Sequence, residues 1–207
     1  MNGSTEYNPT RPHTAAILAG GESRRMGRPK EGVLLPDGRP MIAHVIATLQ
    51  SVCPRVVVVG ACRGFRTPDG VLHLPDLHPG AGPLAGLESL LASGLDDRYL
   101  LSGCDQPLLT PELLRRLAGC GAEEVCIFHT GDEEDFFPFP GVYPAGLLPL
   151  VRDALSAGRR SMKRLIEQAQ VTRIPLTPSE VPLLRSINTP DELADLHSPR
   201  EGRWENG

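Results

Sequence analysis

The amino-acid sequence predicts an α/β protein built on a mostly parallel sheet that helices cover on both faces. Short apolar runs, such as RVVVV at 55–59 and RYLLSG at 98–103, alternate along the chain with segments of helical periodicity. Strands that read as continuous apolar runs are typical of buried parallel sheets, in which each strand is followed by a crossover helix. Ligands of such sheets bind beyond the carboxyl ends of the strands, so candidate sites are sought there.

The elements follow from these runs and from local start signals. The expected strands are 14–19, 55–59, 71–74, 98–103, 124–129 and 171–176. The expected helices are 40–52, 83–93, 111–119, 145–157, 161–169 and 190–197. Thr110 and Pro111 form an N-cap with proline in the first helical position, and Thr189 with Glu192 forms a capping box. Polar, Pro- and Gly-rich ends predict mobile tails at 1–12 and 198–207 around one domain, 13–197.

Composition narrows the class of protein. The chain has 207 residues, 40% of them apolar, and a net charge of −4, which argues against a general nucleic-acid binder. The five cysteines are odd in number and show no C-x-x-C spacing, so neither a disulfide framework nor a zinc site is expected. The polar N-terminus lacks an apolar signal core and no segment is long enough to span a membrane, so we expect a cytoplasmic protein.

Residues 18–30, LAGGESRRMGRPK, leave the first strand as a glycine-rich, cationic loop. Two adjacent glycines allow close backbone approach to a ligand, and the cations add charge for phosphate groups. The glycine spacing does not match a Walker A loop. The alternative interpretation is a turn followed by a solvated basic helix. Together with GRRSMKRL at 158–165, this loop concentrates positive charge in two places, which suits small polyanions.

Two further strand ends carry candidate residues. Asp105 in LLSGCDQP ends the 98–103 strand and is placed to hold Mg²⁺, which takes one or two carboxylates plus substrate phosphates; a turn-capping role is the alternative. GAGPLAG at 80–86 nearly matches a dinucleotide fingerprint but follows the wrong strand, so hydride transfer is rejected. GDEED at 131–135 is expected to be an exposed turn, and the histidines show no metal-ligand spacing.

The order of these motifs resembles the MobA family, the molybdenum cofactor guanylyltransferases of the nucleotidyltransferase superfamily. The resemblance spans residues 14–196 and rests on L-A-G-G-x-S-x-R-M-G-x-x-K at 18–30, LPD at 74–76, GPLAGL at 82–87, GCDQP at 103–107, GVY at 141–143 and NTPDEL at 188–193. It implies a Rossmann-like three-layer α/β/α fold. It also implies Mg²⁺-dependent transfer of GMP from GTP to the terminal phosphate of Mo-molybdopterin, with release of pyrophosphate.

The resemblance assigns roles to individual positions. The implied catalytic residues are Lys30, Asp105 and Arg25, with Asp105 as the Mg²⁺ ligand. The implied nucleotide-binding residues are Leu18, Ala19, Gly20, Gly21, Lys30, Asp76, Gly82, Pro83 and Asp105. The implied molybdopterin-binding residues are Arg159, Arg160 and Asn188. Molybdoenzymes or cofactor-insertion proteins would be transient partners, and no nucleic acid or membrane is expected.

Two departures from the family pattern and three rival functions remain open. The family's better-known members have Asn after the second strand, whereas this chain has Gly60, and alignment around 131–140 is uncertain. A cytidylyltransferase acting on the same cofactor is the nearest rival, although Gly20 favours the larger guanine base. A sugar- or polyol-phosphate nucleotidyltransferase shares the first motif but does not predict GPLAGL with GCDQP. A non-catalytic nucleotide-binding escort for molybdoenzymes would bind nucleotide without releasing pyrophosphate.

Overall fold

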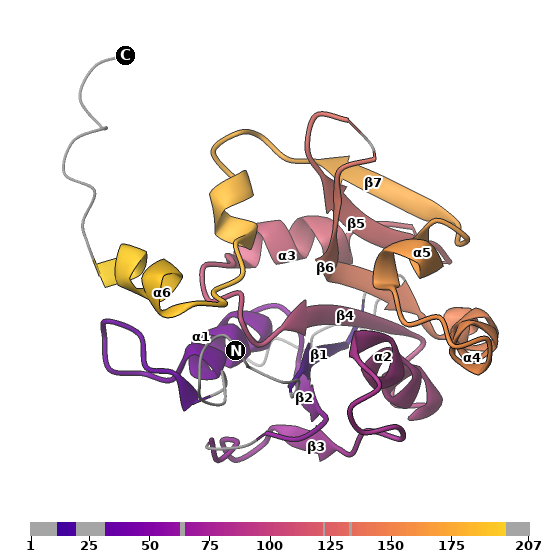
Figure 1. Cartoon of the computed structure of the whole chain (residues 1–207), viewed down its shortest axis with the longest axis horizontal. Helices are drawn as coiled ribbons and strands as arrows, with labels where there is room; N and C mark the ends of the chain where they lie inside the picture. The colour runs from indigo at the N-terminus through magenta and orange to yellow at the C-terminus, as the bar shows by residue number, and fades with distance from the viewer. Residues whose placement is uncertain (1–11, 20–31, 63–64, 122, 133, 198–207) are drawn as a thin grey trace, which may run out of the picture.

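One seven-stranded sheet organises the computed structural model, which describes residues 12–19, 32–62, 65–121, 123–132 and 134–197 (Figure 1). The strands are β1 (Thr14–Leu18), β2 (Arg55–Val59), β3 (Leu72–Leu74), β4 (Arg98–Gly103), β5 (Val125–His129), β6 (Phe136–Pro144) and β7 (Val171–Pro175). They lie in the order β3-β2-β1-β4-β6-β5-β7. The six strands expected from the sequence are therefore confirmed to within one residue at either end, and β6 is an addition.

The helices alternate with the strands as expected. The α-helices are α1 (Met41–Gln50), α2 (Pro83–Ala92), α3 (Pro111–Ala118), α4 (Leu148–Ser156), α5 (Met162–Ile166) and α6 (Pro190–His197). The short helices η2 (Ala145–Leu147) and η3 (Val181–Leu184) precede α4 and α6. The predicted N-cap of α3 is confirmed, because the Thr110 side chain accepts a hydrogen bond from Leu113 N. The predicted tails, 1–12 and 198–207, lie outside the described residues except for Pro12.

Strand β6 runs against all its neighbours, so the sheet is mostly but not wholly parallel. It pairs antiparallel with both β4 and β5, while β1, β2, β3 and β4 pair in parallel, as do β5 and β7. The exposed residues of 131–135 that the structure describes form the β5–β6 connection, as predicted for GDEED. The Phe139–Pro140 peptide bond is cis, and the β5–β6 register shifts between Ile127 and Phe128.

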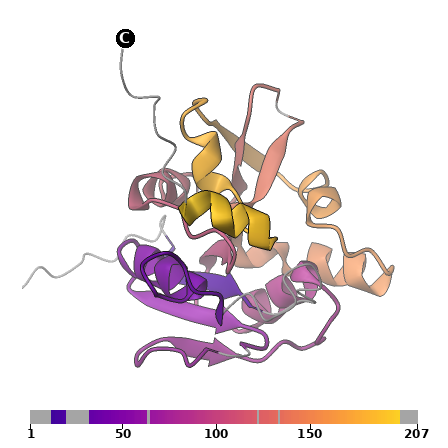
Figure 2. The same ribbon diagram turned by 60° about the vertical axis from the view of Figure 1, so that its left-hand side comes forward.

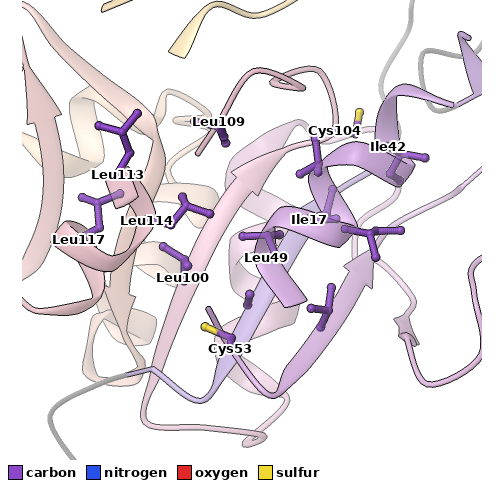
Figure 3. Packing of buried hydrophobic residues seen from close by; sticks show 14 of the residues in the cluster. Ile17, Ile42, Leu49, Cys53, Leu100, Cys104, Leu109, Leu113, Leu114 and Leu117 are labelled. Carbon is purple, nitrogen blue, oxygen red and sulfur yellow. The ribbon is translucent and has the colours of Figure 1, made fainter. Parts of the chain in front are cut away.

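Helices cover both faces of the sheet, which confirms the three-layer α/β/α prediction. One apolar layer packs α1 and α3 against β1, β2 and β4, through Ile42, Leu49, Leu113 and Leu117 among others (Figure 3). The opposite layer packs α2, α4 and α5 against the same sheet. Complete burial of each leucine or isoleucine contributes about 1.5–3 kcal/mol, so the two layers together dominate the stability of the fold. Among the described residues, no helix has the length and apolarity needed to cross a membrane.

Helix α6 lies apart from these layers, and Figure 2 brings it toward the viewer. A small third apolar cluster joins it to the segment before α1. Its buried members are Val33, Leu35, Met41, Ile187 and Leu193. The C-terminal segment is thereby held against the part of the chain that follows the first glycine-rich motif.

Candidate functional site

The carboxyl ends of four parallel strands meet along one edge of the sheet. Leu18 at the end of β1 pairs with Val59 of β2 and Gly103 of β4, and Val59 pairs with Leu74 of β3. Because these last residues are in register, the segments that follow them emerge side by side. This is the edge at which open α/β sheets bind ligands.

Only the start of the glycine-rich motif falls within the described residues. Leu18 and Ala19 are described, whereas the predicted site residues Gly20, Gly21, Arg25 and Lys30 lie outside them. Ala19 N donates to Val59 O at 2.8 Å, which extends the β1–β2 pairing by one residue. The Leu18 side chain packs on α2, where a Cβ atom at Gly86 would lie 2.9 Å from Leu18 Cδ2. At this point a ligand could therefore contact mainly backbone atoms.

Gly60, the residue after β2, has a backbone that requires glycine. Its φ is +91°, and a Cβ atom there would lie 2.4 Å from the carbonyl oxygen of Ala19. Gly60 N donates to Leu74 O at 2.9 Å, and His73 Nε2 lies 2.7 Å from Gly60 O. The tight contact between the ends of β1 and β2 thus leaves no room for a side chain at this position.

Asp76 and the start of α2 form one connected turn. Asp76 Oδ1 accepts a hydrogen bond from His78 N at 2.9 Å and lies 3.3 Å from Ser89 Oγ, on the buried side of α2. Ser89 Oγ also accepts from Leu77 N at 2.9 Å. Gly82, with φ +91°, is the N-cap of α2, and Pro83 is its first residue. Through these two hydrogen bonds, Asp76 holds the turn that leads to the helix start at Gly82 and Pro83.

Asp105 stands just beyond the end of β4 and folds back over it. Its Oδ1 lies so close to Gly103 that a Cβ atom there would be only 2.6 Å away. Its backbone carbonyl accepts a hydrogen bond from Ile187 N at 2.8 Å. The loop after β4 is thereby joined to the segment before α6, which is 82 residues later in the sequence.

Gln106 is a site residue that the sequence analysis missed. Its side chain is 3% exposed, and its Nε2 donates to Phe139 O at 2.9 Å and to Leu184 O at 3.0 Å. Its Oε1 accepts from Gly103 N at 3.3 Å. One buried amide therefore connects the end of β4 with β6 and η3 and holds the loop that carries Asp105. The only sequence signal was its place in GCDQP, because Phe139 and Leu184 are distant in the chain.

The segment before α6 carries Asn188 and confirms the predicted capping box. Glu192 Oε2 accepts from Asn188 N at 2.6 Å and from Thr189 N at 3.1 Å, while Thr189 Oγ1 accepts from Glu192 N at 3.2 Å. These backbone donors, led by Asn188 N, hold the pKa of Glu192 below its ordinary value. Asn188 is next to Ile187, so its backbone is brought close to the Asp105 loop.

The predicted arginine pair lies elsewhere. Arg159 and Arg160 are exposed and precede α5, whose N-cap is Ser161 rather than either arginine. Figure 1 shows α5 and α6 on opposite sides of the molecule. The structure does not bring the arginine pair to Asn188, so a ligand that touched both would have to extend across the sheet edge.

The residues at this edge fit a magnesium ion that is completed by substrate. Among the described residues, no group of three or more His, Cys, Asp or Glu side chains could hold a metal. Mg²⁺ commonly binds through one or two carboxylates plus phosphate oxygens and water. Asp105 supplies one carboxylate. In the same loop, the Gln106 side chain accepts a hydrogen bond from Gly103 N. A single carboxylate at the ligand-binding edge of the sheet matches that chemistry.

The chain is similar to known proteins of one family. The family described as "MobA-like NTP transferase domain" matches residues 15–173. A probable molybdenum cofactor guanylyltransferase of Deinococcus radiodurans is 36% identical over 188 residues, which cover 89% of this chain and 94% of that protein. A molybdenum cofactor guanylyltransferase of Xanthomonas euvesicatoria pv. vesicatoria is 34% identical over 194 residues, which cover 90% of this chain and 95% of that protein.

A solved structure shares the fold. The crystal structure of molybdopterin-guanine dinucleotide biosynthesis protein A from Archaeoglobus fulgidus superposes with a TM-score of 0.71 at 24% identity. The match covers 88% of this chain and 96% of that chain. At this level of identity the likeness establishes the α/β architecture.

Proposed function

The chain belongs to the family of MobA-like NTP transferase domains, and on that premise we propose that it transfers GMP from GTP to the terminal phosphate of molybdopterin. The products are pyrophosphate and the guanine dinucleotide form of the molybdenum cofactor. The relatives at 36% and 34% identity, which carry the guanylyltransferase name, support the choice of reaction.

One observation carries the proposal for the site: the hydrogen bond of 2.8 Å from Ile187 N to Asp105 O. It joins the backbone of Asp105, which we assign to the metal, to the residue before Asn188, which we assign to the acceptor substrate. Donor and acceptor phosphates have to meet within bonding distance, so their binding residues must converge. The Asp105 loop and the segment before α6 lie against each other through this hydrogen bond.

The nucleotide half of the site lies along the ends of β1 to β3. We assign the backbone of Leu18, Ala19, Gly20 and Gly21 to the nucleotide, and the helix start at Gly82 and Pro83 to its base and ribose. Asp76 positions that helix start and presents its carboxylate to the nucleoside. Because Gly60 offers no side chain, backbone groups at this edge take over the contact that Asn makes in other members.

Charge control is the main chemical task, because both reacting groups are phosphates. Asp105 would hold Mg²⁺, which when bound supplies positive charge to the α-phosphate and the leaving pyrophosphate. We also assign Lys30 and Arg25 to the negative charge of the α-phosphate and the pyrophosphate. We assign Arg159 and Arg160 to binding of the acceptor, molybdopterin. A phosphate monoester with a second pKa near ~6 is already ionised at neutral pH, so the nucleophile needs no general base. Positioning and electrostatics are then the protein's contribution.

Replacement of Asp105 tests this proposal. We expect Asp105→Asn to lower Mg²⁺-dependent pyrophosphate release from GTP and molybdopterin by at least about 100-fold, since a preorganised charge in the site is worth roughly 3 kcal/mol or more. Asp153→Asn, an exposed aspartate on α4, is the control and should leave the rate unchanged. Near-normal turnover of the Asp105 variant would refute the metal assignment.

The proposed location and partners follow from the product. We place the reaction in the cytoplasm, where a reducing environment keeps the cysteines as thiols. A cofactor that is labile once made requires delivery, so we propose a transient handoff to molybdoenzymes or cofactor-insertion proteins. Pull-downs with the product-loaded chain should recover such proteins, and recovery of none would count against the handoff while leaving the transfer reaction intact.

A further inference from the structure

Three residues meet at the edge of the sheet opposite Asp105. Arg98 is the first residue of β4, Cys126 lies within β5, and Cys120 follows α3. The Arg98 side chain is 3% exposed, Cys126 is fully buried, and Cys120 is half-buried. A buried cation beside two thiols is unusual enough in a protein interior to require an explanation, and the proposed transfer reaction does not use it.

The guanidinium group of Arg98 connects both cysteines. Its Nη1 donates to Cys120 O at 3.1 Å, and its Nη2 lies 4.0 Å from Cys126 Sγ. The Cys126 thiol also acts on the Cys120 thiol, whose pKa it lowers. The distances from Cys120 Sγ to Arg116 O and from Cys126 Sγ to Glu124 O are 3.9 Å and 3.8 Å. One guanidinium group therefore contacts both the backbone of Cys120 and the sulfur atom of Cys126.

The surroundings give the two thiols different character. The hydrogen bond from the Cys126 thiol, aided by the charge of Arg98, lowers the pKa of Cys120, against the opposing effects of burial and of Glu124. The same pairing, together with burial, raises the pKa of Cys126. Cys120 is thus the more readily ionised and the more exposed of the pair, and thiolates are the reactive form of cysteine.

We propose that Cys120 and Cys126 form a reversible redox pair, in which a peroxide oxidises Cys120 and Cys126 then closes an intramolecular disulfide. In the first step the Cys120 thiolate attacks a peroxide oxygen and the O–O bond breaks, giving a sulfenic acid and, after protonation, water. In the second step Cys126 attacks the Cys120 sulfur and displaces a second water. Two thiols are oxidised by two electrons as one hydrogen peroxide is reduced to two water molecules, and a dithiol reverses the reaction.

The other three cysteines provide internal comparisons. Burial raises the pKa of Cys53 to about 12, and its thiol lies 3.4 Å from Pro12 O. Cys104 is 6% exposed. Cys62 is half-buried, like Cys120. Exposure alone would make Cys62 and Cys120 react alike, whereas the proposal singles out Cys120.

The experiment treats the full-length chain with a small excess of hydrogen peroxide, quenches with acid and counts thiols after denaturation. We expect the count to fall from five to three and to return to five with dithiothreitol. Both cysteines lie in one tryptic peptide, 117–152, which should lose two hydrogens and resist alkylation. Five intact thiols, or a disulfide that includes any other cysteine, would overturn the proposal without use of a variant.

Serine variants then separate the two roles. Cys126→Ser should accumulate a sulfenic acid at Cys120 that dimedone traps, whereas Cys120→Ser should keep its four remaining thiols. Cys62→Ser is the matched control and should still lose the pair of thiols. Dimedone labelling of Cys62 equal to that of Cys120 would show that exposure, rather than the Arg98 pocket, governs oxidation, and would contradict the assignment.

Discussion

At Gln106, one buried amide group determines where the loop after β4 lies. It bonds to backbone groups of three segments that are far apart in the sequence, and through them it holds Asp105 at the sheet edge. The sequence identified Asp105 from its place after an apolar strand. It could not identify Gln106, because a glutamine in a turn is ordinarily exposed and its partners are set by tertiary packing.

Gln106→Met tests this positioning role. The variant keeps the volume of the side chain but leaves Phe139 O and Leu184 O without their donor. We expect the free energy of unfolding to fall by about 1–3 kcal/mol, and kcat to fall more than the KM for GTP changes, because the carboxylate loses its support. Urea unfolding and steady-state kinetics measure the two effects.

Gln168→Met provides the matched control, since that exposed glutamine also donates to a carbonyl, Arg164 O at 2.9 Å. It should alter neither stability nor turnover. If Gln106→Met matched the wild-type chain in both measurements, the positioning role would be wrong.

Gly60 is a second position at which a single side-chain change should have a large effect. A methyl group there would meet Ala19 O at 2.4 Å, whereas Gly70 has a similar φ of +85° and nothing within 4 Å of its would-be Cβ. Gly70→Ala should therefore cost only the left-handed backbone strain of about 1–2 kcal/mol. Gly60→Ala should cost clearly more, as measured by urea unfolding, and should weaken GTP binding. Equal losses in the two variants would mean that the β1–β2 contact relaxes freely.

Among the secondary-structure elements, helices and parallel strands were the predictable part of the fold. Proline at the first helical position placed α3, and Thr189 with Glu192 placed α6, because both signals act within one turn of chain. Strand β6 was missed. Its sequence, FFPFPGVYP, contains three prolines and a glycine, which ordinarily interrupt strands, and only pairing with β4 and β5 makes it one.

The capping box of α6 should make the stability of the fold depend on pH. Because backbone donors depress the folded-state pKa of Glu192, its stabilising contribution is complete above the unfolded pKa of about 4.3 and is lost as pH falls through the lower folded value. Glu192→Gln should therefore be less stable than the wild type at pH 7, with the difference shrinking as the solution is acidified. Urea midpoints measured between neutral and acidic pH check this.

Glu167→Gln, at the end of α5, is the control, because it removes one negative charge from a residue outside the capping box. Its difference from wild type should not follow the same acid dependence. A Glu192 deficit that was constant across the pH range would show that the carboxylate does not bind the Asn188 and Thr189 backbone in its ionised form.

In the whole molecule, the two edges of the sheet have separate tasks. The carboxyl edge collects the ends of β1 to β4 and the segment before α6, and carries the proposed transfer reaction. The opposite edge holds Arg98 and the proposed redox pair. The sequence predicted the first edge because motifs after successive parallel strands share one side. It did not predict the distance between the arginine pair and Asn188, since that depends on how α5 and α6 pack.

We propose that this edge transfers GMP, rather than another nucleotide, to molybdopterin. The most direct measurement is pyrophosphate release with molybdopterin and Mg²⁺ in the presence of GTP, CTP, ATP or UTP, each supplied alone. We expect turnover with GTP and at most a background rate with the other three. Turnover with CTP would identify a cytidylyltransferase, and nucleotide binding without pyrophosphate release from any of the four would contradict a catalytic role altogether.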